Sequence, residues 1–249
     1  MNPRRIVGQG TSEARWQEWF QRRPLPRREI ASLLGGSTVV HVIAPHPDDE
    51  ILGCGGLIRQ ASRLGTAVRI VAVTDGEASH PRSRYWPTAA LARLRTRESE
   101  RALQRLSVPA QRDRLRLADG KVERHEAELV AALCASVAPG DTVVAPWQLD
   151  GHPDHEATAR ASRMAAHARG ARFLEVPIWG WHWADPASEV FPWHRAASLV
   201  LDIEDRQAKS LAISSFHSQL RADPSTGKGP VLPGFALERL GRPFEVLFL

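Results

Sequence analysis

The chain has 249 residues and a mass of 27.5 kDa, which is long enough for one domain with a large core or for two small ones. With 43% hydrophobic and 24% charged residues it is typical of folded chains, and this composition excludes wholesale disorder and fibrous architectures. The net charge of +5 comes mostly from arginines spread along the sequence, without zinc-finger spacing or a basic-helix heptad, so we expect no nucleic-acid partner.

The first segment indicates a short helix at the periphery. Residues 12–20 have helical apolar spacing, and Pro24 ends the helix because proline is not accommodated inside one. We therefore expect residues 1–35 to form a peripheral N-terminal lead-in.

From residue 38 onward, short apolar runs rich in β-branched residues alternate with segments of helical periodicity. Strands are expected at 38–44, 68–74, 115–117, 141–146 and 172–176, and helices at 51–64, 91–106, 123–137 and 154–169. This alternation predicts a three-layer, Rossmann-like α/β fold, in which helices cover both faces of a mostly parallel sheet. The active site is expected at the carboxyl ends of the strands.

The remainder, residues 177–249, is less regular but is assigned to the same single domain, residues 1–249. Its Trp-rich stretch from Trp179 to Trp193 either stacks on a ligand or belongs to the core. A strand at 198–203, a helix at 205–219, a Gly/Pro loop at 223–234 and a terminal strand at 245–249 complete the pattern.

The cellular context is inferred from three features. Cys54 and Cys134 are the only cysteines, too few for a disulfide framework. No window has the roughly 20 apolar residues of a transmembrane segment, and the N-terminus lacks the apolar centre of a secretory signal. We expect a cytoplasmic protein; the sequence leaves its oligomeric state open.

Two polar motifs follow strands that we expect to be buried. Residues 45–50 read Pro-His-Pro-Asp-Asp-Glu, and residues 150–156 read Asp-Gly-His-Pro-Asp-His-Glu. If the two strands are neighbours, the motifs meet at one edge of the sheet. Imidazole and carboxylate are ligands for zinc, and catalytic zinc sites combine three protein ligands with one open position.

His46 and Asp49 can converge on one metal ion, and His152 or His155 can supply a third ligand. Asp48 is then a spare carboxylate for use as a general base, and the remaining imidazole can face a developing oxyanion. The alternative is that the acidic residues cap or charge the first turns of two helices. Two such motifs, each after a strand, favour the metal site.

The motifs resemble those of the PIG-L, or LmbE-like, family of zinc-dependent N-deacetylases. The resemblance rests on residues 46–50 with the glycines that follow, on Thr74-Asp75-Gly76-Glu77, and on His152-Pro153-Asp154-His155. It covers about residues 39–160 and extends loosely to Lys209 and Ser218-Gln219.

This resemblance implies one zinc ion or another divalent metal per chain. It implies that His46, Asp49 and His155 bind the metal and that Asp48 is the general base. By the same resemblance, His152 stabilises the oxyanion or protonates the leaving amine, and Asp154 orients an imidazole. Some thiol-precursor deacetylases carry a mobile Tyr two residues before the first His of the second motif, where this chain has Asp150.

Four further residues are candidates for substrate contacts. Asp75 and Glu77 follow the second strand and can face sugar hydroxyls, although Asp75-Gly76 is equally a simple turn. Arg82 and Arg84 lie in the next loop, where an arginine can meet a phosphate or carboxylate.

The sequence therefore predicts a metal-dependent hydrolase that removes an N-acetyl group from a small-molecule amino sugar or glycoconjugate. A metal-dependent amidase acting on a non-sugar amide, such as a thiol conjugate or an antibiotic, is the nearest alternative. A nucleotide- or nucleic-acid-binding α/β module is the non-enzymatic alternative; it lacks a glycine-rich phosphate loop after the first strand.

Overall fold

The computed structural model describes residues 4–249 and contains one sheet of seven strands in the order β3-β2-β1-β4-β5-β7-β6. The first five strands of this order are parallel to one another, and β7 pairs antiparallel with both β5 and β6. The strands are β1 (Val39–Ala44), β2 (Ala67–Thr74), β3 (Gln111–Leu117), β4 (Thr142–Pro146), β5 (Arg172–Val176), β6 (Ala196–Val200) and β7 (Phe244–Phe248).

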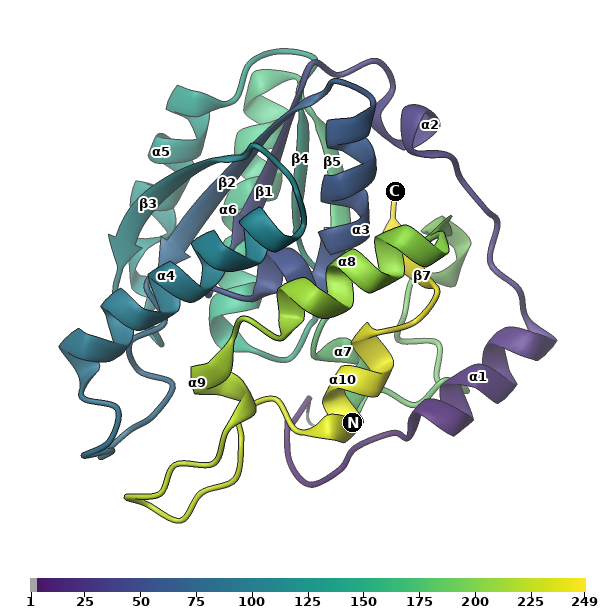
Figure 1. Cartoon of the computed structure of the whole chain (residues 1–249). Helices are drawn as coiled ribbons and strands as arrows, with labels where there is room; N and C mark the ends of the chain where they lie inside the picture. The colour runs from purple at the N-terminus through teal and green to yellow at the C-terminus, as the bar shows by residue number, and fades with distance from the viewer. Residues whose placement is uncertain (1–3) are drawn as a thin grey trace.

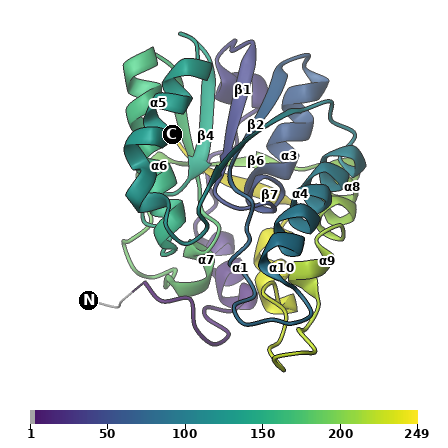
Figure 2. The same ribbon diagram turned by 90° about the vertical axis from the view of Figure 1, so that its left-hand side faces the viewer.

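Helices cover both faces of this sheet, as Figures 1 and 2 show: α5 and α6 on one face, and α3, α4 and α8 on the other. The N-terminal segment, α7, α9 and α10 gather beyond the carboxyl ends of the strands, at the lower side of Figure 1. The helices are α1 (Glu13–Arg22), α2 (Ile30–Leu34), α3 (Asp49–Arg63), α4 (Thr88–Arg105), the 3₁₀ turn η1 (Val122–His125), α5 (Glu126–Ser136), α6 (Pro153–Arg169), α7 (Gly180–Trp183), the 3₁₀ turn η2 (Trp193–Arg195), α8 (Ile203–Ile213), α9 (His217–Leu220) and α10 (Gly234–Leu240).

The strand order confirms the predicted three-layer α/β fold and identifies a topological switch point. The chain runs outward from β1 to β2 and β3 on one side, and β4 and β5 continue on the other. β1 and β4 are therefore direct parallel neighbours, with Val40 opposite Thr142 and Val42 opposite Val144. In open α/β sheets a ligand crevice forms at such a point, beyond the carboxyl ends of the strands.

The expected elements differ from the observed ones in several places: α2 and α7 were not expected, and the strand expected at 198–203 is β6, at Ala196–Val200. β3 begins at Gln111 rather than residue 115. It is an edge strand whose charged side chains stay partly exposed, so its sequence lacks the apolar pattern of a buried strand. The helix expected at 205–219 is interrupted between α8 and α9, where the backbone of Ser215 and Phe216 bonds to Ala212 and Ile213 in tight turns. α10 was not expected from the sequence.

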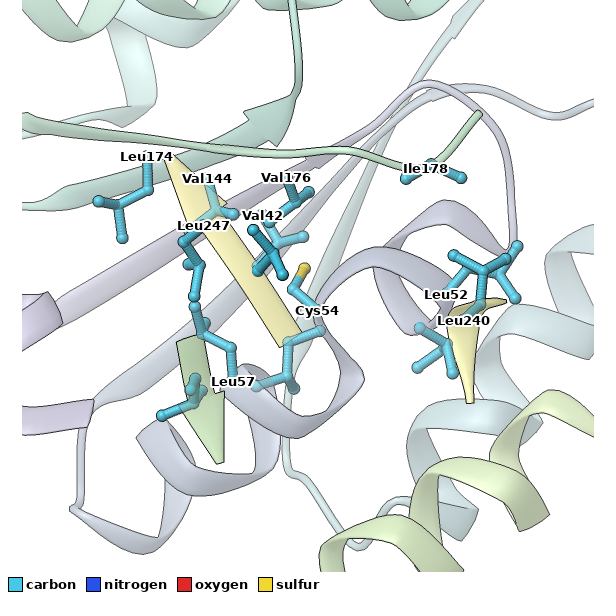
Figure 3. Close-up of a cluster of buried hydrophobic side chains, with 14 of the residues drawn as sticks. Val42, Leu52, Cys54, Leu57, Val144, Leu174, Val176, Ile178, Leu240 and Leu247 are labelled. Atoms are coloured by element: carbon cyan, nitrogen blue, oxygen red, sulfur yellow. The ribbon is translucent and has the colours of Figure 1, made fainter. Parts of the chain in front are cut away.

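The core joins distant parts of the chain. Figure 3 shows Val42, Val144 and Val176, from three adjacent strands, lying close to Leu57 of α3 and Leu247 of β7. Trp16 of α1 is fully buried in the same cluster, and its indole nitrogen donates to the carbonyl of Trp181 at 2.9 Å. Residues of the N-terminal lead-in and of the less regular C-terminal part thus share one core. No helix within residues 4–249 combines the length and apolar character needed to cross a membrane.

A buried ion pair supports a kink in α3. Cys54 has non-helical dihedral angles (φ −145°, ψ 30°), which interrupts the helix just before Gly56 and Leu57. The carboxylate of Glu245 accepts hydrogen bonds from both of these backbone N–H groups, at 2.7 and 2.8 Å. It also accepts from Lys209 Nζ at 2.7 Å, and both side chains of the pair are buried. The terminal strand is thereby fastened to the helix that begins at the first motif.

We expect Lys209→Met to lower the free energy of unfolding by about 3–5 kcal/mol, because it leaves the Glu245 carboxylate buried without its cation. Urea unfolding followed by circular dichroism measures this. Lys228→Met, at an exposed lysine, is the matched control and should change stability by less than about 0.5 kcal/mol. Equal effects of the two variants would contradict the role assigned to the pair.

Candidate metal centre

The first motif forms the turn between β1 and α3. Thr74 of β2 donates to the carbonyl of Pro45 through both its backbone N–H, at 3.1 Å, and its hydroxyl, at 2.8 Å, which fixes the start of the turn. Asp49 then accepts a hydrogen bond from the backbone N–H of His46 at 2.9 Å. Both side chains are buried, so the motif is held against the end of the sheet rather than displayed to solvent.

The second motif forms the turn between β4 and α6. His152 is the N-cap of α6, Pro153 occupies the first helical turn, and His155 follows one turn later with its side chain fully buried. Proline suits this position because its fixed φ and missing N–H fit the start of a helix. The turn therefore places the imidazoles of His152 and His155 at the same edge as the first motif.

The two motifs meet at Asp49. Its Oδ2 atom lies 3.2 Å from His46 Nδ1 and 3.2 Å from His155 Nε2. Ligands about 2.0–2.1 Å from a tetrahedral metal ion lie roughly 3.3 Å apart, so these spacings suit a shared ion. His46, His152 and His155 also offer nitrogen atoms that all lie within 4.8 Å of one another.

The surroundings of His155 show that a cation fits beside its Nε2 atom. Its Nδ1 is engaged by Asp150 Oδ2 at 2.8 Å, while its buried Nε2 has no hydrogen-bond partner within residues 4–249. Burial alone would lower the pKa of His155, but the charge of Asp49 and the hydrogen bond to Asp150 outweigh it and raise this pKa to about 9. An environment that attracts a proton to this nitrogen also attracts a metal ion, which can replace that proton.

Asp150 holds His155 in this orientation. Its two oxygens accept hydrogen bonds from the backbone N–H groups of Ile178, Trp179 and Gly180, all at 2.8–2.9 Å. A carboxylate that receives the Nδ1–H of a histidine leaves Nε2 free for the metal and fixes the ring orientation, as is usual for metal-binding histidines.

His46 is held in a similar way from its other nitrogen. Its Nε2 lies 3.2 Å from Asp154 Oδ2 and 3.1 Å from Asp119 Oδ1. Asp154 in turn accepts from the backbone N–H groups of Gly120 and Val122, at 2.7 and 3.1 Å. We therefore assign the Nε2–H tautomer, which directs the Nδ1 lone pair toward Asp49.

Asp48 precedes Asp49 in the chain and has an unusual backbone conformation. Its φ of 156° is one that residues other than glycine rarely adopt, and its N–H donates to Glu50 Oε2 at 3.0 Å. Arg95 of α4 donates to Asp48 Oδ2 at 3.0 Å. Burial raises the pKa of Asp48 to about 7, and the charge of Arg95 opposes this rise. Among the described residues Asp48 makes no capping hydrogen bond to α3, so its carboxylate is not used as a helix cap.

His152 is held as a neutral imidazole. Its Nδ1 accepts the backbone N–H of Asp154 at 3.2 Å, which leaves the ring proton on Nε2. Burial lowers the pKa of His152 to about 3, and the neighbouring His155 and His46 add to this effect. Near neutral pH this side chain is therefore a hydrogen-bond donor without charge.

A cavity of about 430 Å³ opens over these groups, within the size range of small-molecule sites. Gln219 of α9 is fully buried and lines it. Its Nε2 donates to Ser218 Oγ at 2.8 Å, and its Oε1 has no partner in the described part of the chain. The lining residues are Ile6, His46, Asp48, Asp49, Leu52, Ala78, Ser79, Arg95, Asp119, Gly120, His152, Trp179, Gln219, Val231 and Leu232.

The four residues expected to contact substrate lie outside this lining in residues 4–249. Asp75 is bound by both Arg114 Nε and Nη2, at 3.0 and 2.7 Å. Glu77 accepts the backbone N–H of Asp119 at 3.0 Å. Arg82 and Arg84 belong to the loop at 75–87, whose backbone bonds to Ser225 through the N–H of Arg84. Glu77 thus supports the loop that carries Asp119.

Sequence reasoning missed the roles of Asp119, Arg95 and Asp150. Arg95 was one of many arginines on a charged helix, and Asp119 stood alone before Gly120. Asp150 opens the second motif and stands where some deacetylases carry a tyrosine, but no role was assigned to its side chain. Its distance from His155, five residues along the chain, gave no sign of the contact. The one usable signal for Asp119 is that Asp119-Gly120 comes shortly after the strand expected at residues 115–117.

We expect Asp150→Asn to weaken binding of a divalent metal by about 10–100-fold, because the amide cannot hold His155 and the three backbone donors as the carboxylate does. Competition with a chelating dye measures this affinity, on protein shown to be folded by circular dichroism. Asp113→Asn, at a half-exposed carboxylate on β3, should leave the affinity unchanged. An unchanged affinity in Asp150→Asn would contradict the role of Asp150.

The chain is similar in sequence to a known deacetylase. The chain is 29% identical over 154 residues to the 2'-N-acetylparomamine deacetylase of Streptomyces fradiae, a match that covers 52% of this chain and 52% of that protein. The chain thus spans about half the length of the curated relative it matches.

Solved structures show the same fold. The A40926 pseudoaglycone deacetylase is 25% identical, with a TM-score of 0.57 over 74% of this chain and 83% of that one. The N,N'-diacetylchitobiose deacetylase of Pyrococcus horikoshii is 20% identical, with a TM-score of 0.50 over 83% of this chain and 80% of that one. The PIG-L family model, GlcNAc-PI de-N-acetylase, matches residues 41–166, which include both motifs, most of β1 and all of β4. The chain therefore belongs to the PIG-L family of deacetylases.

Proposed function

We propose that this protein is a zinc-dependent hydrolase that removes the N-acetyl group from an amino sugar or glycoconjugate. The observation that carries the proposal is the position of Asp49 Oδ2, 3.2 Å from a nitrogen of both His46 and His155, with Asp48 adjacent in the chain. His46, Asp49 and His155 would hold the ion. A bound zinc ion would polarise the amide carbonyl and favour a nucleophilic water near neutral pH.

The residues of this chain then divide the proton transfers between them. Asp48, with a pKa of about 7, accepts a proton from the attacking water and can return it to the leaving amine. Arg95 keeps the Asp48 carboxylate in place through its 3.0 Å contact. Neutral His152 donates its Nε2–H to the negative charge that develops on the oxygen of the acetyl carbonyl group.

Several features support an amino sugar as the substrate. Asp119 and Gln219 line the cavity with oxygen acceptors, and sugar hydroxyls are donors that suit them. The carboxylates of Asp48, Asp49 and Asp119 line the cavity and would repel a phosphate group. This repulsion argues against a nucleotide-binding function. The matched deacetylases of a paromamine derivative and of diacetylchitobiose support the same substrate class.

We expect Asp48→Asn to lower kcat by about 10²–10⁴-fold, because it removes the general base. We expect His152→Ala to lower kcat by about 10²–10³-fold through loss of an oxyanion donor. Both variants should retain zinc, measured by elemental analysis, and acetate release from a panel of N-acetyl amino sugars measures kcat. If His152→Ala loses zinc in proportion to its loss of activity, His152 is not an oxyanion donor, and the role assigned to it is contradicted.

Metal removal should lower thermal stability as well as activity. Zinc at 100 times its dissociation constant stabilises a single-site protein by about 2.7 kcal/mol, or roughly 5–10 °C in Tm at this chain length. Thermal scans with chelator and with added zinc measure the shift, and Asp49→Ala should abolish it. If neither the chelator nor added zinc changes the Tm of the wild type, the proposed site is contradicted.

A further inference from the structure

The lining of the cavity is mixed. The carboxylates, Arg95 and the imidazoles of His46 and His152 share it with apolar side chains from four separate segments. These apolar residues are Ile6, Leu52, Trp179, Val231 and Leu232. A wholly polar substrate that filled the cavity would leave these apolar side chains poorly matched, because apolar surface is best covered by apolar groups.

Ile6 belongs to a segment that lies far from both motifs in the sequence and outside the matched family region, which begins at residue 41. We refer to Arg4–Thr11 as the N-terminal strap. At its start, Arg4 donates to both oxygens of Glu156 at 3.0 and 3.1 Å. Glu156 follows His155 directly, so the strap is tied to the helix that bears the second motif.

The other end of the strap is fixed to α7 and α10. The carbonyl of Val7 lies 3.0 Å from His182 Nε2, and the N–H of Thr11 donates to the carbonyl of His182 at 2.8 Å. Arg239 of α10 donates to the carbonyl of Gln9. At Gly10, φ is 62° and an added Cβ would lie 2.3 Å from the carbonyl oxygen of His182, so the close approach requires glycine. These contacts hold the strap in one place over the cavity.

Within the strap, neighbouring side chains have opposite environments. Ile6 is half-buried and lines the cavity, whereas Val7 is 68% exposed. The strap thus presents one apolar side chain to the same space as Trp179, whose aromatic ring suits stacking against a sugar face or an aryl group.

We propose that the N-terminal strap determines substrate specificity. Ile6 with Trp179 and Leu232 forms a subsite that receives an apolar group attached to the acetylated amino sugar, so the substrate is a glycoconjugate with an apolar aglycone rather than a free sugar. This inference rests on the proposed deacetylase function, whose catalytic groups line the same cavity.

The test compares Ile6→Trp with Val7→Trp on the zinc-loaded full chain. The substrates are the methyl and the 4-nitrophenyl glycosides of N-acetylglucosamine. We expect the wild type to favour the aryl glycoside by about tenfold or more in kcat/KM. Ile6→Trp should raise KM for the aryl glycoside by about tenfold, because the larger side chain fills the subsite, and change the methyl glycoside less than about twofold. Val7→Trp should change neither.

A binding measurement separates this inference from the proposed function. Calorimetry gives the dissociation constants of the two deacetylated glycosides, which need no turnover. The subsite is supported if the wild type and Val7→Trp bind the aryl glycoside more tightly than the methyl glycoside and Ile6→Trp does not. This result would stand even if no acetate is released and the proposed function fails. Equal affinity of the wild type for both glycosides, or equal effects of the two variants, overturns the subsite whatever the activity.

Discussion

The adjacency of β1 and β4 is the constraint on which the site depends. These parallel strands lie at the switch point of the sheet, so the turns that follow them leave from neighbouring positions. One turn carries His46, Asp48 and Asp49, and the other carries His152 and His155. Residues more than 100 positions apart in the chain thereby approach to 3.2 Å without any long loop reaching across the fold.

The electrostatics follow from this crowding. Asp49, Asp119, Asp150 and Asp154 all lie within 3.2 Å of a nitrogen of His46 or His155. Buried carboxylates are stable only when they are paired or when they hold a cation. Backbone N–H groups satisfy Asp150 and Asp154, whereas Asp49 has one backbone donor and faces two imidazole nitrogens. The arrangement therefore favours positive charge beside Asp49, as a metal ion supplies.

The sequence predicted the part of this architecture that is encoded locally. Buried strands such as Val39–Ala44 have a clear β-branched pattern, and each motif comes at or shortly after the end of its strand, so the fold and the two clusters could be inferred. Asp150, Arg95 and Ile6 were not predictable, because their importance comes from tertiary contacts with His155, Asp48 and the cavity. The strand Gln111–Leu117 was underestimated for a related reason: its charged residues suit an edge position that only the assembled sheet defines.

Anomalous diffraction at the zinc absorption edge, from crystals of the zinc-loaded protein, would locate the ion. We predict one strong peak per chain, within bonding distance of Asp49 Oδ2, His46 Nδ1 and His155 Nε2. A zinc peak located instead between Asp119 and Asp154, or no peak beside Asp49 at saturating zinc, would contradict it.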